Sequence, residues 1–261
     1  MDSMILGNGA LGDAIGAALR RRGDGVRLLG RPPDGRGHDP SGLTGAAVVF
    51  DASRSDAVAA NVAVALAAGC RRFVIATTGW EADRSRVDRS LTDARAVAVA
   101  ASNLSLGAAL FGRLVETATE LFGPLAGFDP YLVEWHRRGK RDRPSGTALD
   151  LARRIVARHP RVHRLPTAGD EHGRADGPRP DDELEIVAIR AGSSPGQHLV
   201  GFDAAGETVE LRLTARDRSA YAAGALAAAD WLLGSPRAPG LHSFDAVVDD
   251  LLTARPLAAT A

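Results

Sequence analysis

The feature that most constrains the fold is a glycine-rich turn near the start of the chain. An apolar run, Met4–Leu6, leads directly into the sequence Gly-Asn-Gly-Ala-Leu-Gly at positions 7–12, and the apolar residues that follow recur at helical spacing. A strand, a glycine turn and a helix in direct succession are typical of the first unit of a parallel α/β sheet. The sequence is therefore expected to begin a sheet of strands linked by crossover helices.

Short apolar segments continue to alternate with helical stretches up to about Asn103. We predict strands over Val26–Leu29, Ala46–Phe50 and Phe73–Ala76, and a helix over Ala57–Ala68. Parallel strands need such crossover helices between them. The pattern predicts an α/β fold with an N-terminal Rossmann-type dinucleotide-binding domain.

Each glycine of the turn has a physical role if a dinucleotide binds there. Gly7 permits the tight turn, Gly9 lets the backbone approach a pyrophosphate, and Gly12 allows the helix to pack closely on the strand. The helix N-terminus then offers unpaired N–H groups and a partial positive charge to the anion. The predicted contacts are Gly7, Asn8, Gly9, Ala10, Leu11 and Gly12. The motif alone is not specific, because any tight glycine turn can have this spacing.

The end of the second predicted strand bears on which dinucleotide is bound. An acidic residue at this place would bind the ribose hydroxyls, but the chain has Gly30-Arg31 and no carboxylate before Asp34. An arginine suits the additional 2′-phosphate of NADPH. We therefore expect NADPH to be favoured, with Arg31 as a contact. NADH stays open, because Arg31 could also be one solvated arginine among many.

After Asn103 the pattern of the sequence changes. Residues 104–216 are predicted to form an α+β domain with a mixed sheet, and residues 217–261 to complete the domain formed by residues 1–103. The elements expected in this part of the chain are helices near Ala108–Leu121 and Ala220–Leu233, a strand around Tyr131–Trp135, and antiparallel strands over Glu185–Arg190, His198–Phe202 and Thr208–Leu213 with a turn at 204–207. The stretch Gly169–Asp182 is rich in Gly, Pro and Asp and is expected to be a mobile loop.

The most informative stretch is the polar block Glu134–Ala148, which reads EWHRRGKRDRPSGTA. Ser145 is placed to cap a helix, because apolar residues recur on one helical face after it. The N–H groups of Gly146 and Thr147, with the Thr147 hydroxyl, would then form an anion site of the size of a carboxylate. The basic residues that precede this site are His136, Arg137, Arg138, Lys140 and Arg141. An anionic small molecule is therefore the expected ligand.

Lysine usage singles out one residue of this block. The chain has 32 lysine and arginine residues, and all but Lys140 are arginine. An ammonium is compact and can hand over a proton, whereas a guanidinium is a broad planar fork that stays charged. We therefore expect Lys140 to act in the chemistry, although a single lysine could also fall here by chance.

Histidine is the side chain best suited to supply a proton near neutral pH. His136 ends a predicted strand beside several cations, which should lower its pKa, and we predict it to be catalytic. The other six histidines are expected to be structural or simply exposed, without a metal-ligand cluster. Cys70 is the single cysteine, which excludes an internal disulfide and a cysteine zinc site, and no metal is predicted.

Charge and composition exclude other classes of partner. Lys+Arg and Asp+Glu balance at 32 each, so no long-range field favours nucleic acid or an anionic membrane. The apolar runs are too short to span a bilayer, and the first residues lack the pattern of an export signal. We expect a cytoplasmic protein that acts on a small molecule.

The polar block strongly resembles the active-site signature of the dihydrodipicolinate (4-hydroxy-tetrahydrodipicolinate) reductases, Glu-x-His-His-x-x-Lys-x-Asp-x-Pro-Ser-Gly-Thr-Ala. Asp51–Arg54 resembles the family's turn after the third strand, Ala76–Trp80 its loop near nicotinamide, and Ala101–Gly107 its hinge between domains. The similarity covers nearly the whole chain. The further cofactor contacts that it implies are Ser53, Arg54, Ala76, Thr77, Thr78, Ala101, Ser102, Asn103 and Leu104.

The resemblance implies the reduction of 4-hydroxy-tetrahydrodipicolinate to tetrahydrodipicolinate by NADPH or NADH, in lysine and diaminopimelate biosynthesis. Hydride would add to a conjugated carbon of the cyclic imine, His136 would protonate the carbanion-like intermediate, and Lys140 would stabilise charge on the substrate. The implied substrate contacts are Arg137, Ser145, Gly146, Thr147 and, more weakly, Arg218. The family also implies that the second domain binds the substrate and that its sheet assembles a homotetramer.

The chain departs from the family pattern at several places. Arg137 stands where the signature has its second histidine, Trp135 precedes His136, and the glycine turn is one residue shorter than usual. Arg137 could hold the same dicarboxylate more tightly, or it could mark a divergent member that reduces a different carboxylated cyclic imine in specialised metabolism. A non-catalytic NADPH-binding regulatory protein is a lesser alternative, because it would be expected to lack His136 or Lys140.

Overall fold

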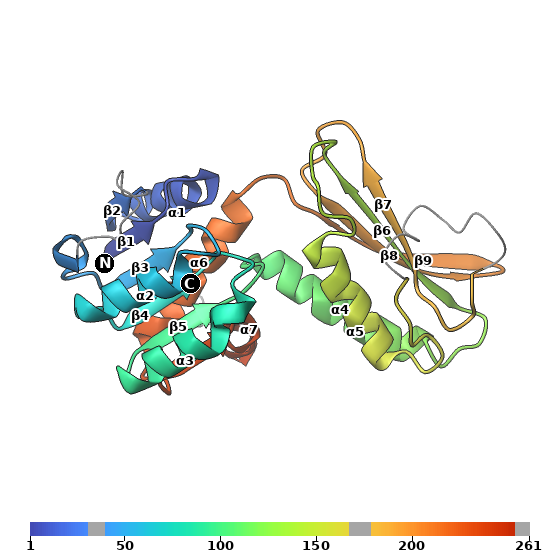
Figure 1. Cartoon of the computed structure of the whole chain (residues 1–261). Coiled ribbons are helices and arrows are strands. Elements are labelled where there is room, and N and C mark those ends of the chain that lie inside the picture. The colour runs from blue at the N-terminus through green and yellow to red at the C-terminus, as the bar shows by residue number, and fades with distance from the viewer. Residues whose placement is uncertain (31–39, 167–178, 254–261) are drawn as a thin grey trace, which may run out of the picture. The chain divides into compact units, whose positions relative to one another are not determined.

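The structure is a computed structural model, and it describes residues 1–30, 40–166 and 179–253. The chain forms two compact units (Figure 1): unit 1 combines Met1–Ala109 with Arg218–Ala261, and unit 2 is Leu110–Asp217. Arg31 and most of the predicted loop Gly169–Asp182 lie outside the described residues. No helix within the described ranges is long and apolar enough to cross a membrane.

Unit 1 is built on a six-stranded parallel sheet with the strand order β10-β5-β4-β3-β1-β2. Its strands are β1 (Asp2–Leu6), β2 (Gly25–Leu29), β3 (Val48–Asp51), β4 (Arg72–Ile75), β5 (Val97–Ala100) and β10 (Gly240–Ser243). The chain builds outward in one direction from β1 to β2 and then in the other direction from β3. In open α/β sheets, ligands bind at the carboxyl ends of the strands where the direction reverses, which here is between β1 and β3.

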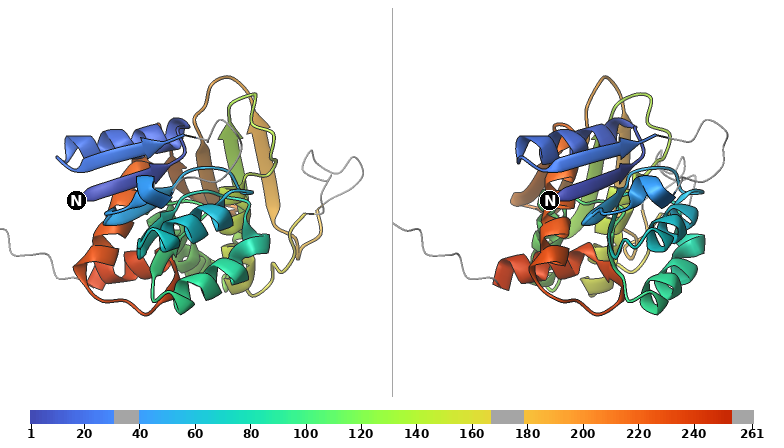
Figure 2. Two further views of the ribbon diagram at one scale, coloured as in Figure 1. Left: turned by 60° about the vertical axis from the view of Figure 1, so that its left-hand side comes forward. Right: turned by 90° about the vertical axis from the view of Figure 1, so that its left-hand side faces the viewer.

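Helices cover both faces of this sheet, as the views in Figure 2 show. One face carries α1 (Ala10–Arg21), α6 (Ser219–Gly234) and α7 (Phe244–Thr253), and the other carries α2 (Val58–Ala67) and α3 (Arg84–Asp93). Short 3-10 turns lie at Pro40–Leu43 and Glu81–Asp83. Each face of the sheet packs against its helices in a separate hydrophobic core, and successive residues of a strand point into opposite cores. Ile5 packs on the side of α1, α6 and α7, whereas Met4 and Leu6 pack on the side of α2 and α3.

The predicted Rossmann-type sheet is confirmed, but part of it was not predicted. The first four strands and α2 lie within a few residues of their expected ranges. Strand β5, helix α3, strand β10 and helix α7 were not predicted. The strand Val97–Ala100 consists only of alanine and valine, and Arg84–Asp93 is a largely polar helix, so neither has a strong periodic signal. Strand β10 joins the sheet only because α6 returns the chain to its edge beside β5.

Unit 2 contains a four-stranded mixed sheet with the order β7-β6-β8-β9. Its strands are β6 (Asp129–His136), β7 (Glu185–Arg190), β8 (Gln197–Ala204) and β9 (Glu207–Thr214). One face packs on α4 (Leu106–Phe122) and α5 (Gly146–Arg158) through a core that includes Phe111, Leu132, Ile155 and Phe202. The second predicted fold class, α+β with a mixed sheet, is therefore confirmed.

The prediction that Glu185–Arg190 is an antiparallel strand is wrong. Strand β7 pairs with β6 in parallel, with Tyr131 opposite Glu185. The cause is α5, which lies between β6 and β7 in the chain and carries it back to the start of the sheet, so that the two strands run in the same direction. The hairpin of β8 and β9 is antiparallel, as predicted, with the turn between Ala204 and Glu207.

Candidate active site

The glycine turn of unit 1 lies at the carboxyl end of β1 and has the geometry that a phosphate-binding loop needs. Gly7 has φ +112°, and a Cβ built there would lie 2.3 Å from the carbonyl oxygen of Ala52 in the loop after β3. A Cβ on Gly12 would lie 2.0 Å from the carbonyl oxygen of Gly7, so helix and turn are in close contact. At Gly9, the residue before the first turn of α1, a Cβ would meet nothing within 4 Å. The turn thus leaves open space at the start of α1, where helix N–H groups point.

The loops after β3 and β4 are fastened to each other by a buried carboxylate. Asp51 is 2% exposed, and its Oδ1 accepts hydrogen bonds from the Ser53 hydroxyl at 2.7 Å and the Thr77 hydroxyl at 2.6 Å. Its Oδ2 accepts from Asn61 Nδ2 at 2.8 Å. Ser53 N also donates to the Thr77 hydroxyl at 2.9 Å. Two segments that the sequence predicts as cofactor contacts are therefore held side by side at the carboxyl edge of the sheet.

The remaining predicted cofactor residues lie along the same edge. Ala76, Thr77 and Thr78 follow β4, and Ala101, Ser102, Asn103 and Leu104 follow β5. Asn103 Oδ1 accepts a hydrogen bond from Ser105 N at 2.9 Å, and Gly224 of α6 packs directly on the carbonyl group of Leu104. Arg54 pairs with Asp56 at 2.8 Å on the surface.

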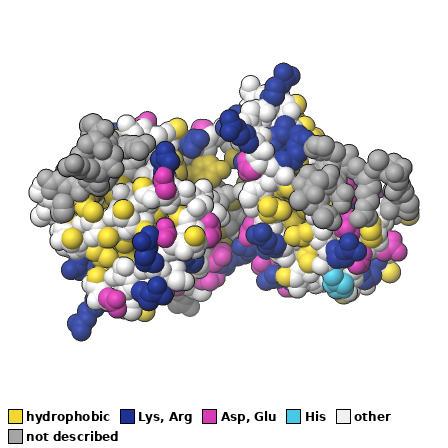
Figure 3. Space-filling view, in the orientation of Figure 1, with side chains coloured by type: hydrophobic (Ala, Val, Ile, Leu, Met, Phe, Trp, Pro, Cys, Tyr) yellow, Lys and Arg dark blue, Asp and Glu magenta, His cyan; other side chains and the backbone are white. Residues whose placement is uncertain are grey.

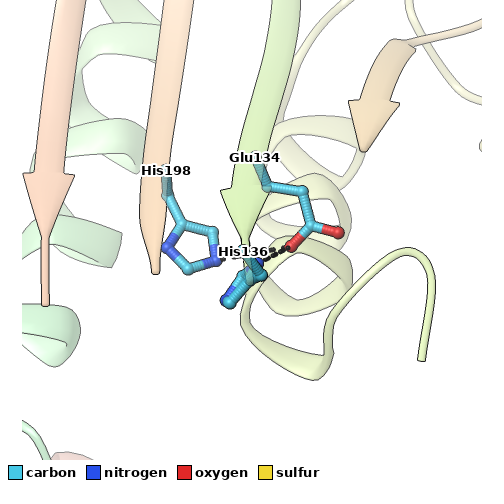
Figure 4. A group of neighbouring side chains, drawn as sticks. All are labelled: Glu134, His136 and His198. Carbon is cyan, nitrogen blue, oxygen red and sulfur yellow. Dashed lines mark ion pairs between the residues drawn. The ribbon is translucent and has the colours of Figure 1, made fainter. Parts of the chain in front are cut away.

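In unit 2 two residues of the polar block meet a side chain from the neighbouring strand at one end of the sheet (Figure 4). Glu134 and His136 are two residues apart on β6, so their side chains point to the same face of the sheet. His198 lies opposite Glu134 on the neighbouring strand β8. Glu134 Oε2 lies 3.1 Å from His136 Nδ1 and 3.8 Å from His198 Nε2. The two imidazole rings meet edge to face, with their centroids 5.2 Å apart. All three side chains are buried.

The other oxygen of Glu134 ties the end of β6 to α5 and to β7. Its Oε1 accepts hydrogen bonds from Ser145 N at 2.8 Å and from Arg190 Nη2 at 2.7 Å. Ser145 also caps α5, because its hydroxyl accepts from Ala148 N at 3.2 Å, as predicted. The same hydroxyl lies 3.2 Å from His198 Nε2. The helix cap and the polar network are thus one structure.

The residues predicted to hold an anion lie at the start of α5. The first intrahelical backbone bond of this turn runs from Leu149 N to Ser145 O, and Gly146 is the exposed first residue of the helix. A Cβ on Gly146 would meet nothing within 4 Å. This helix start is therefore open to a ligand such as a carboxylate.

Lys140 lies in the turn between β6 and α5, with its side chain 23% exposed and its Nζ 2.7 Å from Asp142 Oδ2. Arg190 Nη2 also donates to the carbonyl oxygen of Asp142 at 2.6 Å, which links this turn to β7. Arg137 is exposed, like the neighbouring Arg138 and Arg141. Figure 3 shows basic side chains gathered at this end of unit 2. Arg218 is exposed at the start of α6 in unit 1.

The pKa values of the network follow from burial and from these charges. Burial lowers the pKa of His136, and Lys140 and Arg190 lower it further, while Glu134 opposes them. Burial lowers the pKa of His198 to about 4, with a further contribution from His136. Burial acts to raise the pKa of Glu134, but its hydrogen bonds with Ser145 and Arg190 outweigh burial and lower it. Glu134 is therefore ionised and His198 neutral near pH 7.

Four residues of this network were not predicted as site residues: Glu134, Asp142, Arg190 and His198. Glu134 and Asp142 belong to the polar block, where a carboxylate among cations was an available signal. Arg190 and His198 had no such signal. They come from strands far along the chain and reach the site only because β7 and β8 flank β6.

The same three side chains are close enough to be considered as a metal site. The possible ligand atoms of Glu134, His136 and His198 all lie within 4.8 Å of one another, and this is the one such group in the described part of the chain. Arg190 is paired with the carboxylate, however, and the charge of Lys140 reaches both imidazoles. A divalent cation would be repelled by both groups, so we interpret the cluster as a polar network.

Comparison with known proteins agrees with the sequence resemblance. The family model described as dihydrodipicolinate reductase, C-terminus, matches residues 107–248. The 4-hydroxy-tetrahydrodipicolinate reductase of Wolinella succinogenes is 38% identical over 191 residues, which cover 73% of this chain and 72% of that protein. The enzyme of the same name from Myxococcus xanthus is 38% identical over 195 residues, 75% of this chain and 69% of that protein.

Solved structures support the fold. A dipicolinate-bound dihydrodipicolinate reductase from Paenisporosarcina sp. TG-14 superimposes with a TM-score of 0.69 at 18% identity, over 93% of this chain and 97% of that one. A probable dehydrogenase from Thermotoga maritima gives a TM-score of 0.58 at 9% identity, over 97% of this chain and 94% of that one. At these identities the likeness concerns the fold alone.

The low pKa of His198 predicts a specific acid sensitivity of folding. A histidine whose pKa is lowered from 6.5 to about 4 on folding binds its proton more readily in the unfolded chain. Its contribution to stability is therefore complete above pH 6.5 and is lost as the pH falls from there toward 4. Between pH 7 and pH 5 this loss amounts to about 2 kcal/mol of the free energy of unfolding.

We expect His198→Gln to remove this loss. Urea unfolding at pH 7 and pH 5 should give a difference between the two pH values that is smaller in the variant than in the parent by about 2 kcal/mol. His163→Gln, which changes an exposed histidine of the same unit, serves as the control and should leave the difference unchanged. Equal pH differences in the parent and His198→Gln would show that His198 is not held neutral by the fold.

Proposed function

The chain belongs to the dihydrodipicolinate reductase family, and on this basis we propose that it reduces 4-hydroxy-tetrahydrodipicolinate to tetrahydrodipicolinate with NAD(P)H, in lysine and diaminopimelate biosynthesis. The activity is assigned to particular residues of this chain by what lies at the end of β6. There His136, Lys140 and the open start of α5 lie within one short segment, supported by the buried Glu134.

Unit 1 would bind the cofactor and unit 2 the substrate. The positive φ of Gly7 and the open space at Gly9 fit a pyrophosphate at the start of α1, and the loops joined by Asp51 fit the nicotinamide end. When bound, the reduced nicotinamide supplies a hydride to the ring of the substrate.

The substrate is an anion, and unit 2 offers it matching groups. The N–H groups of Gly146 and Thr147 at the start of α5 would hold one carboxylate, with Ser145 fixing the helix end behind them. Arg137 would contact the second carboxylate. Lys140 would leave its ion pair with Asp142, bind the substrate and stabilise the negative charge that develops on the substrate. Arg218 is a weaker candidate from unit 1.

His136 would supply the proton. The 4-hydroxyl group of the substrate leaves as water, which makes the ring conjugated. Hydride addition to the carbon that carried the hydroxyl then leaves an electron pair on the neighbouring carbon, and this pair takes the proton from the imidazolium of His136. The imidazole of His136 is then neutral, and solvent protonates it again. The carboxylate of Glu134 beside the ring favours the imidazolium and opposes the effect of burial and of the nearby cations on the pKa of His136.

A second candidate substrate follows from Arg137. An arginine in place of the neutral imidazole of the family signature adds a charge and a longer side chain to the substrate site. A different carboxylated cyclic imine of specialised metabolism would then be the substrate, with the same groups acting on it. A purely regulatory NADPH-binding protein is not favoured, because both His136 and Lys140 are present.

The test is NAD(P)H oxidation with freshly prepared 4-hydroxy-tetrahydrodipicolinate, beside a panel of other carboxylated cyclic imines. We expect turnover of the first compound, and a fall in kcat of about 100-fold or more in His136→Ala because proton delivery is lost. Cofactor affinity, measured by nucleotide fluorescence, should stay within about two-fold, because the substitution lies in unit 2.

His163→Ala is the matched control and should keep the parent rate, because His163 is exposed and lies outside the network. Turnover only on the panel would identify the second candidate substrate. A full rate in His136→Ala would exclude His136 as the proton donor.

We further propose that NADPH is the preferred cofactor and that Arg31 binds its 2′-phosphate. The support comes from the sequence, because no acidic residue ends β2 to hold the ribose hydroxyls. In Arg31→Ala we expect KM for NADPH to rise by about ten-fold or more, while KM for NADH changes little. Equal increases for both cofactors would exclude Arg31 as a phosphate contact.

We also propose that the protein is a cytoplasmic homotetramer that assembles through the open face of the unit 2 sheet. On this face Trp135, Val187 and Ile189 are 39%, 39% and 40% exposed, and Trp135 lies directly opposite Ile189 in the pairing of β6 with β7. Adjacent exposed apolar side chains on a sheet face are typical of an interface.

Sedimentation velocity of the purified chain should therefore give a tetramer, and Ile189→Glu should give smaller species because a charge would be buried at the contact. Leu251→Glu, at an exposed leucine of unit 1, is the control and should leave the tetramer intact. A monomeric parent protein would contradict the proposal.

A further inference from the structure

The reaction as proposed uses His136 but leaves the buried carboxylate beside it without a role. Glu134 has no exposed surface, and burying a charge is costly unless other groups compensate it. Its two oxygens have different surroundings. Oε1 has two strong donors, Ser145 N and Arg190 Nη2, whereas Oε2 faces the imidazoles of His136 and His198.

The donors on Oε1 fix the orientation of the carboxylate. Arg190 Nη2 also donates to Asp142 O at 2.6 Å, so the guanidinium is itself held at the turn before α5. Ser145 N belongs to the capping residue of α5 and cannot move independently of the helix. With Oε1 held from β7 and from α5, Oε2 has to point toward His136 Nδ1, 3.1 Å away. Both atoms are buried and make no hydrogen bond to any other described group, so each is the nearest polar partner available to the other.

This arrangement decides which nitrogen of His136 faces the reactants. With Nδ1 turned toward Glu134, the opposite nitrogen, Nε2, lies next to Gly196, where a Cβ would be only 3.0 Å away. The absence of a side chain at Gly196 leaves room at Nε2. A proton carried on Nε2 can therefore leave His136 on the side away from the carboxylate.

We propose, on the basis of the function proposed above, that Glu134 is a positioning residue for His136: it orients the ring through Nδ1, presents Nε2 for proton delivery and stabilises the imidazolium. Arg190 and Ser145 serve the same purpose one step further away, because they orient Glu134. This division resembles the general arrangement in which a buried carboxylate orients a catalytic histidine.

The charges around His136 explain why a carboxylate is needed here. The groups that face the ring are Glu134 on β6, Lys140 and Asp142 in the following turn, Arg190 on β7 and His198 on β8. Burial and the two cations all disfavour the imidazolium, and His198 is neutral near pH 7. Glu134 and Asp142 both raise the pKa of His136, and Glu134 has the larger effect. Without Glu134, His136 would therefore be protonated only at lower pH.

The experiment compares Glu134→Gln with the parent protein through the pH dependence of kcat. The donor must be protonated, so kcat falls as the pH rises through the pKa of His136 in the complex. We expect this fall to move to lower pH by about one unit in Glu134→Gln, and kcat at pH 8 to drop by about ten-fold or more. Glu207→Gln, the same change at an exposed hairpin residue, is the control and should leave the profile unchanged.

Removing one partner of a buried ion pair can destabilise the fold, so a second variant removes both charges. Glu134→Gln/Arg190→Met leaves no unpaired guanidinium and is expected to stay folded. The pKa of His136 can be followed in each protein by NMR of histidine Cε1–H groups, with His136→Ala to assign the signal. We expect the pKa of His136 to be highest in the parent, lower in the double variant and lowest in Glu134→Gln. The double variant is less affected than Glu134→Gln because it also loses the positive charge of Arg190, which lowers this pKa. A pKa of His136 in Glu134→Gln that equals the parent's value would overturn the proposal.

These readouts separate this inference from the proposed function. A full rate in His136→Ala would exclude the proton donor, while the NMR titration would still report whether Glu134 controls the ring. The alternative that the cluster holds a metal is tested with Zn²⁺ alone, by calorimetry. No stoichiometric binding is expected. Tight binding of one Zn²⁺ that is lost in Glu134→Gln would replace the positioning role by a metal site.

Discussion

The structure of unit 2 depends above all on one buried carboxylate. Glu134 accepts hydrogen bonds from the cap of α5 and from Arg190 on β7, and it faces two imidazoles with its other oxygen. A charge without exposed surface is tolerated only when its oxygens are compensated in this way. The contacts that make the burial of Glu134 possible are therefore the same contacts that bring His136, Ser145 and the start of α5 together.

Unit 1 also has a buried carboxylate that holds loops together, at the carboxyl edge of its sheet. Asp51 ends β3, is buried, and accepts hydrogen bonds from Ser53, Thr77 and Asn61, so that the loops after β3 and β4 are held together. In both units a carboxylate on a buried strand fixes loops that would otherwise have many conformations. Preorganised loops of this kind lower the entropic cost of holding a cofactor or a substrate.

The outline of the fold was accessible from the sequence because its signals are local. The glycine turn, the first four strands and the cap at Ser145 depend on neighbouring residues, and the structure has each of them where it was expected. Elements with weak periodicity, such as β5 and the polar α3, were not predicted. The direction of β7 was predicted wrongly, because alternation along a strand reports which face is buried and carries no information on whether its neighbour runs parallel.

The sequence by itself determined the family, the domain that resembles dinucleotide-binding folds and the segment that carries His136 and Lys140, since all of these reside in contiguous motifs. Only the tertiary structure decided what surrounds His136. Arg190 and His198 lie more than fifty residues along the chain, and they reach Glu134 because β7 and β8 pair with β6 on either side. Pairing between distant strands is set by the packing of the whole sheet, which no local pattern of residues specifies.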